Sequence, residues 1–197
     1  SAQTARAVRK MLAMVTQPST TATNGMAFPV QPSVQLQDAA NNPVAQPGVV
    51  VTAAISTGGG TLGGTLTATT NAGGLATFTN LVITGVVGAR TLAFSSGVLT
   101  PVVSGTVTTS AGAATQIAIN AGNGQTATVN TAVTTPLSVL VRDVSLNPVA
   151  GVSVTFGVAS GGGSILPVAP VVTNASGVAA LTSWTLGNLA GANSVAA

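Results

Sequence analysis

Cysteine, histidine and tyrosine are absent from this chain of 197 residues, and its only two acidic residues, Asp38 and Asp143, are aspartates. Without cysteine there is no disulfide framework, thiolate zinc site or thiol chemistry. Most side chains that serve as general acids, bases or nucleophiles are also missing. The sequence therefore predicts a protein that is not an enzyme and that uses no cofactor or metal.

Charged residues are scarce as well, at 4 % of the chain, where soluble domains usually carry about 25 %. The net charge of +3 arises from five basic residues against two acidic ones, and aromatic residues make up only 3 %. Nucleic-acid binding needs a stripe of cations, often with stacking aromatics, so we exclude it. No apolar run approaches the ~18 residues of a membrane-spanning helix.

Three of the five basic residues, Arg6, Arg9 and Lys10, lie together near the N-terminus. The plainer interpretation of residues 1–10 is a solvated lead-in to the first strand. The alternative is a basic arm that contacts an acidic partner or an anionic membrane surface. Ser1–Thr4 lacks the apolar core of a signal peptide, so we expect a processed, exported chain.

A turn followed by an alternating strand is the clearest local pattern. The turn contains Asp143, Asn147 and Pro148, residues that hydrogen-bond their own backbone or fix φ. Residues 152–158 then alternate between large apolar side chains and Ser, Thr or Gly. A period of two indicates a strand with one face on a core.

The same unit occurs earlier, with Asp38, Asn42 and Pro43 in the turn. Triple glycines at 58–60 and 161–163 match at nearly the same spacing. The chain is therefore a tandem duplication, which we divide into an N-terminal basic arm (1–10), a first domain (11–109) and a second domain (110–197).

The first domain has the alternation and turn spacing of about seven short strands. This pattern is typical of an immunoglobulin-like β-sandwich. The predicted fold class is thus all-β, with two tandem immunoglobulin-like sandwiches. The expected strands of the first domain are 12–16, 32–37, 49–56, 62–69, 75–82, 90–94 and 98–107.

The second copy has no match for the last strand of the first. On the repeat alignment Phe94 corresponds to Ala197, so the strand at 98–107 has no counterpart. An open sandwich exposes backbone groups and a core seam. Three explanations stay open: a piece of a longer repeat protein, a strand supplied by a neighbouring protein, or cover from a larger assembly.

The motifs of both copies resemble those of bacterial surface proteins with immunoglobulin-like repeats. The first copy is similar in residues 16–19, 34–38 and 74–81, and the second resembles the invasin/intimin class in residues 141–143, 147–149, 151–156, 177–179 and 184–187. The resemblance implies an adhesin stalk, spacer or assembly module at the cell surface or in the periplasm, and generally no enzymatic activity.

Each residue that could carry chemistry also has a structural interpretation. We assign Asp38 and Asp143 to turn-holding hydrogen bonds, because one carboxylate per domain is too few for calcium. The triple glycines indicate loops, since no Lys-Ser/Thr follows them. Trp184, the only tryptophan, is expected in a core and gives no aromatic platform for a sugar. No small-molecule substrate is therefore expected.

Two functional hypotheses follow. In the first, the protein is an exported extrinsic subunit, peripheral to a membrane, that stabilises a large assembly such as a photosynthetic or respiratory complex, with other subunits as partners. In the second, it is part of a cell-surface adhesin, filament or phage or surface decoration protein. The low charge and the unfinished second sandwich favour the first, and the resemblance favours the second.

Overall fold

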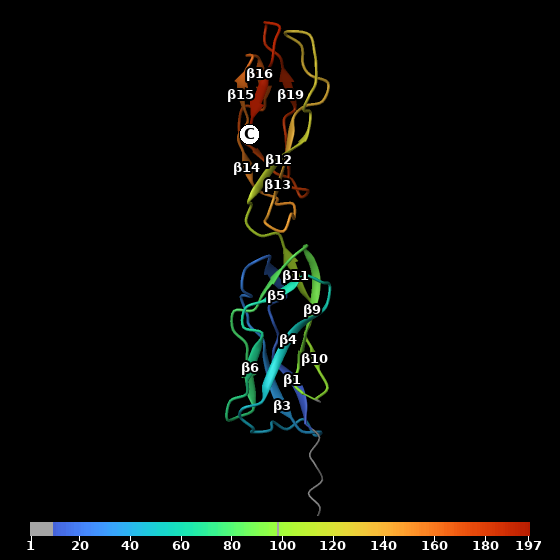
Figure 1. Cartoon of the computed structure of the whole chain (residues 1–197), viewed down its shortest axis with the longest axis vertical. Helices are drawn as coiled ribbons and strands as arrows, with labels where there is room; N and C mark the ends of the chain where they lie inside the picture. Colours follow the sequence, from blue (N-terminus) through green and yellow to red (C-terminus); the bar gives the residue numbers. More distant parts are fainter. Residues whose placement is uncertain (1–9, 98) are drawn as a thin grey trace, which may run out of the picture. The chain divides into compact units, whose positions relative to one another are not determined.

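The computed structural model describes residues 10–97 and 99–197 and divides the chain into two compact units, Ser1–Ser110 and Ala111–Ala197 (Figure 1). None of the described residues lies in a helix, so no helix there could cross a membrane. The predicted all-β fold class is confirmed.

The first unit contains eleven short strands in its described part. They are β1 (Met11–Thr16), β2 (Thr21–Thr23), β3 (Ser33–Gln37), β4 (Val50–Thr57), β5 (Thr61–Gly63), β6 (Thr67–Thr69), β7 (Leu75–Thr77), β8 (Val82–Thr84), β9 (Gly88–Ser95), β10 (Val102–Val103) and β11 (Val107–Ser110).

These strands form two main sheets. One has the order β1-β3-β7, and the other has the order β2-β11-β9-β4-β6, with β10 also paired to β9. Strands β5 and β8 pair separately. All pairings are antiparallel except that of β2 with β11, which is parallel.

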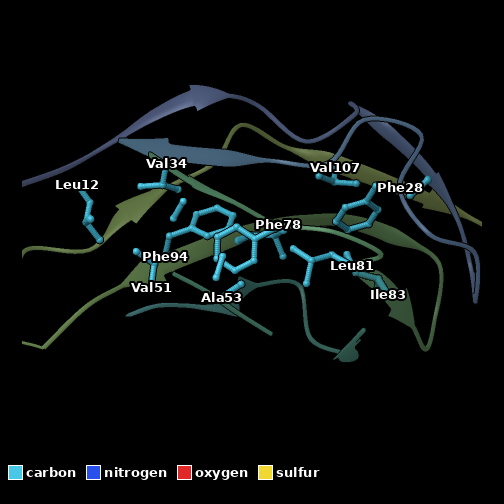
Figure 2. Close-up of a cluster of buried hydrophobic side chains, with 14 of the residues drawn as sticks. Leu12, Phe28, Val34, Val51, Ala53, Phe78, Leu81, Ile83, Phe94 and Val107 are labelled. Carbon is cyan, nitrogen blue, oxygen red and sulfur yellow. The ribbon is translucent and has the colours of Figure 1, made fainter. Parts of the chain in front are cut away.

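The two sheets face each other across one hydrophobic core (Figure 2). Val34 comes from the first sheet, Val51 and Phe94 come from the second, and all three are fully buried. The rings of Phe78 and Phe94 lie 5.1 Å apart and are tilted by 55°. Burying such side chains is the main source of stability in this unit. The predicted sandwich is confirmed.

Several strand bounds differ from those expected. The segment 62–69 is two strands, because Gly64 (φ 86°) turns the chain between β5 and β6. Likewise 75–82 divides into β7 and β8, and 98–107 into β10 and β11. Strand β2 was not predicted, since its three residues place only Ala22 in the core.

One glycine in the first unit is required by both its backbone and its surroundings. Gly74 has φ 78° and lies in the turn where the backbone N–H groups of Gly73 and Leu75 donate to the Asn71 side chain. A Cβ there would lie 1.9 Å from the carbonyl oxygen of Val44. Only glycine allows the turn and the loop after β3 to lie this close together.

The second unit is built from the same plan with fewer pairings. Its strands are β12 (Gln116–Ala121), β13 (Ser138–Arg142), β14 (Ser153–Val154), β15 (Gly157–Ser160), β16 (Ser164–Leu166), β17 (Val171–Val172), β18 (Val178–Ala180), β19 (Ser183–Thr185) and β20 (Ser194–Ala196). One sheet has the order β12-β13-β18, and the remaining strands pair as β14-β17, β15-β20 and β16-β19.

The alternation predicted for residues 152–158 appears in the burial of this unit. Val154 and Phe156 are buried, and Ser153, Thr155 and Gly157 are exposed. The core also contains Trp184, which is 8 % exposed. The predicted core position of Trp184 is therefore confirmed.

Up to Ala197, the second unit has fewer strands than the first. Between residues 111 and 197 no strand corresponds to β2, β10 or β11 of the first unit, and β20, the counterpart of β9, pairs with β15 alone. The prediction of a sandwich without its last strand is confirmed for this stretch.

Candidate binding edge of the second unit

The turn that contains Asp38 is held by its own side chain. One carboxylate oxygen, Oδ1, accepts hydrogen bonds of 2.9 Å from the backbone N–H groups of Ala40 and Asn42. The other, Oδ2, accepts a 3.1 Å hydrogen bond from the Asn42 side-chain amide. Pro43 follows and bridges to Gln37.

These bonds lower the pKa of Asp38 below its ordinary value of 3.8, first through the Asn42 backbone N–H and then through the Asn42 side chain. A carboxylate with a lowered folded-state pKa stabilises the fold fully above its unfolded pKa. That contribution is lost as the pH falls through the lower folded value. The turn of the first unit is therefore weakened only in strong acid.

The matching turn of the second unit is more enclosed. Asp143 is completely buried, and its carboxylate accepts hydrogen bonds from the backbone N–H groups of Gly112, Ser145 and Asn147 at 2.8–2.9 Å. The Asn147 side-chain amide donates a further bond of 2.9 Å. Pro148 bridges to Arg142 as Pro43 does to Gln37. Both aspartates thus have structural contacts in this structure.

The two turns differ at one residue whose backbone is left-handed. Asn41 has φ 64° in the first unit, and Leu146 has φ 65° at the matching position of the second. Asparagine tolerates this conformation, whereas it costs other L-residues about 1–2 kcal/mol. Leu146 is 57 % exposed, so its side chain gains little from burial.

We expect Leu146→Asn to stabilise the second unit by about 0.5–1 kcal/mol. Urea unfolding followed by the fluorescence of Trp184 measures this change, because the single tryptophan lies in this unit. Leu146→Ala is the control, since it shortens the side chain and keeps the strained backbone. Equal stability of the two variants would contradict the explanation.

The basic residues near the N-terminus have different places. Arg6 and Arg9 lie outside the described residues, so their role as partner contacts stays a prediction. Lys10 donates a hydrogen bond from its ammonium group to Oε1 of Gln46, at the surface of the first unit.

One arginine is buried, which the sequence did not predict. Arg90 is 2 % exposed, and its guanidinium donates to the carbonyl oxygens of Gly59 and Gly88 at 2.8 and 2.9 Å. It also donates to the Val86 carbonyl and the Thr109 hydroxyl. Because Thr109 lies in β11, this side chain ties β9 to the last strand. A lone arginine in a sequence gives no sign of such a role.

The triple glycines form turns between strands in both units, as expected of loops. Among residues 10–97 and 99–197, no group of three His, Cys, Asp or Glu side chains is placed to hold a metal ion. The position of Arg90 is taken by Asn193 in the second unit, whose side chain contacts the backbone of Gly187 and Gly191.

An apolar surface that includes Ile117, Ile119 and Val195 lies beside β20 and β12 of the second unit, and we call it the open edge. Ile117 and Ile119 of β12 are 49 % and 61 % exposed. Their counterparts in the first unit, Leu12 and Met14, are buried and half-buried against the core. Large apolar side chains exposed side by side commonly mark an interaction site.

A cavity of about 250 Å³ opens at this edge. Its lining includes Ile119, Phe156, Trp184 and Val195, and it contains no charged side chain. The indole Nε1 of Trp184 is buried and has no hydrogen-bond partner in the structure. A buried donor without a partner is costly, so an acceptor at this site would stabilise it.

Comparison with solved structures finds similar folds at low identity. The adhesin InvE of Yersinia pseudotuberculosis is 21 % identical over 91 % of this chain and 52 % of its own, with a TM-score of 0.40. Invasin, a bacterial integrin-binding protein, is 18 % identical over 94 % of this chain and 35 % of its own, with a TM-score of 0.42. Domains 5–6 of the S-layer protein SbsC are 18 % identical over 94 % of this chain and 88 % of theirs, with a TM-score of 0.32.

The invasin class that the sequence motifs resemble is therefore among the similar structures. This chain spans about half of the InvE structure and about a third of the invasin structure. At these identities and TM-scores the likeness supports no argument about function. No protein-family model matches the chain, and no curated protein matches it.

Proposed function

We propose that this protein is a non-catalytic structural and binding protein that associates with other proteins through its β-sandwich units. The observation that carries the proposal is the open edge, where Ile117 and Ile119 lie exposed beside an uncharged cavity. Exposing such an apolar surface to water costs free energy, and a protein partner that covers the surface removes that cost.

The composition supports the non-catalytic part of the proposal. A chain without His, Cys, Glu or Tyr has few groups for acid–base or nucleophilic chemistry. Both aspartates are engaged in turn hydrogen bonds, in matching places of two separate units.

Within this class we favour an exported extrinsic subunit of a larger assembly. The reason is the combination of an apolar open edge with a chain of which only 4 % of the residues are charged, which is little to keep a free monomer in solution. Peripheral contact with an anionic membrane through Arg6, Arg9 and Lys10 belongs to this proposal. The second candidate is a cell-surface adhesin, filament or decoration protein, which the tandem duplication favours, because repeated units are typical of such arrays.

Native purification from the source organism separates these candidates. For an assembly subunit we expect the chain to migrate with other proteins, and mass spectrometry to identify the same partners after mild crosslinking. Recovery of the protein alone from the cell surface would contradict the assembly role and support the adhesin-type candidate. Recovery as a free monomer from every fraction would contradict protein association altogether.

A further inference from the structure

Asn174 is the only asparagine of the chain that is followed, two positions on, by serine or threonine. The tripeptide Asn174–Ser176 therefore forms the one Asn-x-Ser/Thr motif, which is the acceptor pattern for N-linked sugars. It lies in the turn between β17 and β18, which has a counterpart at residues 71–74 of the first unit. So short a motif also occurs by chance, and its structural context decides whether a sugar can be attached.

The amide group of Asn174 is oriented by the turn. Its oxygen Oδ1 accepts hydrogen bonds from the backbone N–H groups of Ser176 at 2.9 Å and Val178 at 3.1 Å. Because both neighbours are donors, the nitrogen Nδ2 points away from them. Among residues 10–97 and 99–197, no group accepts a hydrogen bond from Nδ2. Residues 174–176 are all exposed, so this nitrogen is accessible in the folded protein.

The hydrogen bonds to Oδ1 also favour the chemistry of attachment. An amide nitrogen is a weak nucleophile, and it must lose a proton when it bonds to a sugar. The donors at Oδ1 stabilise the negative charge that collects on this oxygen as the proton leaves. Two backbone bonds of 2.9 Å already close the turn, from Asn174 to Val178 and from Gly177 to Asn174. The acceptor therefore has this geometry before any enzyme binds.

The composition of the chain gives such a modification a physical role. Only 4 % of the residues are charged, and an Asn-linked sugar is bulky, hydrophilic and solubilising. Val172, two residues before Asn174, is 59 % exposed. A sugar on Asn174 would add hydroxyl groups to a part of the surface that has exposed apolar side chains.

We propose that Asn174 is a glycosylation site that takes a sugar from a phosphate-linked carrier. Nδ2 forms a bond to the anomeric carbon of the sugar, and the bond between that carbon and the carrier phosphate breaks. The phosphate keeps the electron pair, and the amide proton passes to a base of the glycosyltransferase. The Ser176 hydroxyl is the group that the transferase recognises. This site goes beyond the proposed function and does not involve the open edge.

Peptide mass spectrometry of the protein isolated from its source tests the proposal. We expect the peptide that contains Asn174 to be heavier by one or more sugar residues, with fragmentation placing them on the asparagine. A single hexose indicates direct transfer from a nucleotide carrier, whereas an oligosaccharide indicates a lipid carrier, and both support the site. An unmodified peptide, or a sugar attached through the Ser176 hydroxyl, would overturn the proposal.

The first unit provides matched variants. Asn71 accepts the same two hydrogen bonds, from Gly73 at 2.9 Å and Leu75 at 3.1 Å, but it has glycine where the second unit has Ser176. Expressed in the source organism, Ser176→Gly should therefore keep the turn and lose the sugar completely. Gly73→Ser should gain a second sugar on Asn71. A Cβ at Gly73 would meet only the Asn71 Oδ1, at 3.4 Å, so serine fits there.

These variants also separate the motif from the fold. Urea unfolding followed by Trp184 fluorescence should give the same midpoint for Ser176→Gly and for wild-type protein without its sugar. A sugar that stays on Ser176→Gly would refute recognition through the hydroxyl and with it the assignment. If Gly73→Ser gained no sugar while Asn174 carried one, the turn geometry would not be what makes the acceptor, and the structural argument would be wrong.

Discussion

Replacing Asp143 with alanine should destabilise the second unit by about 3 kcal/mol, one of the two largest effects we expect in this protein. The carboxylate is fully buried and accepts hydrogen bonds from three backbone N–H groups and the Asn147 side chain. Alanine would leave these donors without the acceptor they now share. One of them belongs to Gly112, so the turn would also detach from the segment that leads into β12.

Urea unfolding followed by Trp184 fluorescence measures this loss in the second unit. Asp143→Asn provides a further comparison, because it keeps one acceptor oxygen but adds an amide that faces donors, and it should fall between wild type and Asp143→Ala. Asp38→Ala is the matched control in the first unit. Its carboxylate lies nearer the solvent, so hydrogen exchange in β3 should show a clearly smaller loss. Similar losses at the two aspartates would contradict the role of burial.

The two aspartates also show where prediction from the sequence ends. Their turns share Asp, Asn and Pro at the same spacing, so the sequence predicts the same local hydrogen bonds in both. Burial separates them, and for Asp143 one contributor is Gly112, 31 residues away along the chain. No local pattern contains that contact, because it depends on how the segment before β12 crosses the turn.

The strands show the same difference between local sequence patterns and contacts over long distances in the chain. Alternating apolar residues were enough to predict β1, β3 and β4, because each places several side chains on one face of the sheet. Strand β2 depends on its parallel pairing with β11, which begins 84 residues after the end of β2. The same three residues at Thr126–Thr128 form no strand, since nothing pairs with them within the described second unit. Identical sequences therefore take different structures where the partner strand differs.

The candidate site was predicted in outline and found in detail by the structure. Alignment of the two copies was enough to show that residues 111–197 contain no match for the last strand of the first copy. It could not show the exposure of Ile117 and Ile119, because their spacing is that of ordinary core residues. The unpartnered Nε1 of Trp184 and the cavity beside it are likewise products of packing. The alignment contains neither feature, and both can be tested by experiment.

Replacing Phe94 with alanine should destabilise the first unit by about 3–5 kcal/mol. The ring is fully buried, lies 5.1 Å from that of Phe78 and belongs to β9, which pairs with β4, β10 and β11. Its removal would leave a cavity at the centre of the core shown in Figure 2. The contact with the Phe78 ring would be lost, and no neighbouring side chain could fill the space of the Phe94 ring unless a strand moved.

Hydrogen exchange of the amides in β4 and β9 measures this effect, because the most protected amides report global opening of the unit. Phe94→Leu keeps an apolar side chain in the core and should lose less than half as much. The Trp184 transition in the same samples should stay unchanged, since the hydrophobic cores of the two units share no residue. If Phe94→Ala lowered the Trp184 transition as much as the protection of β9, the two units would unfold together, and the independence inferred from their separate cores would be wrong.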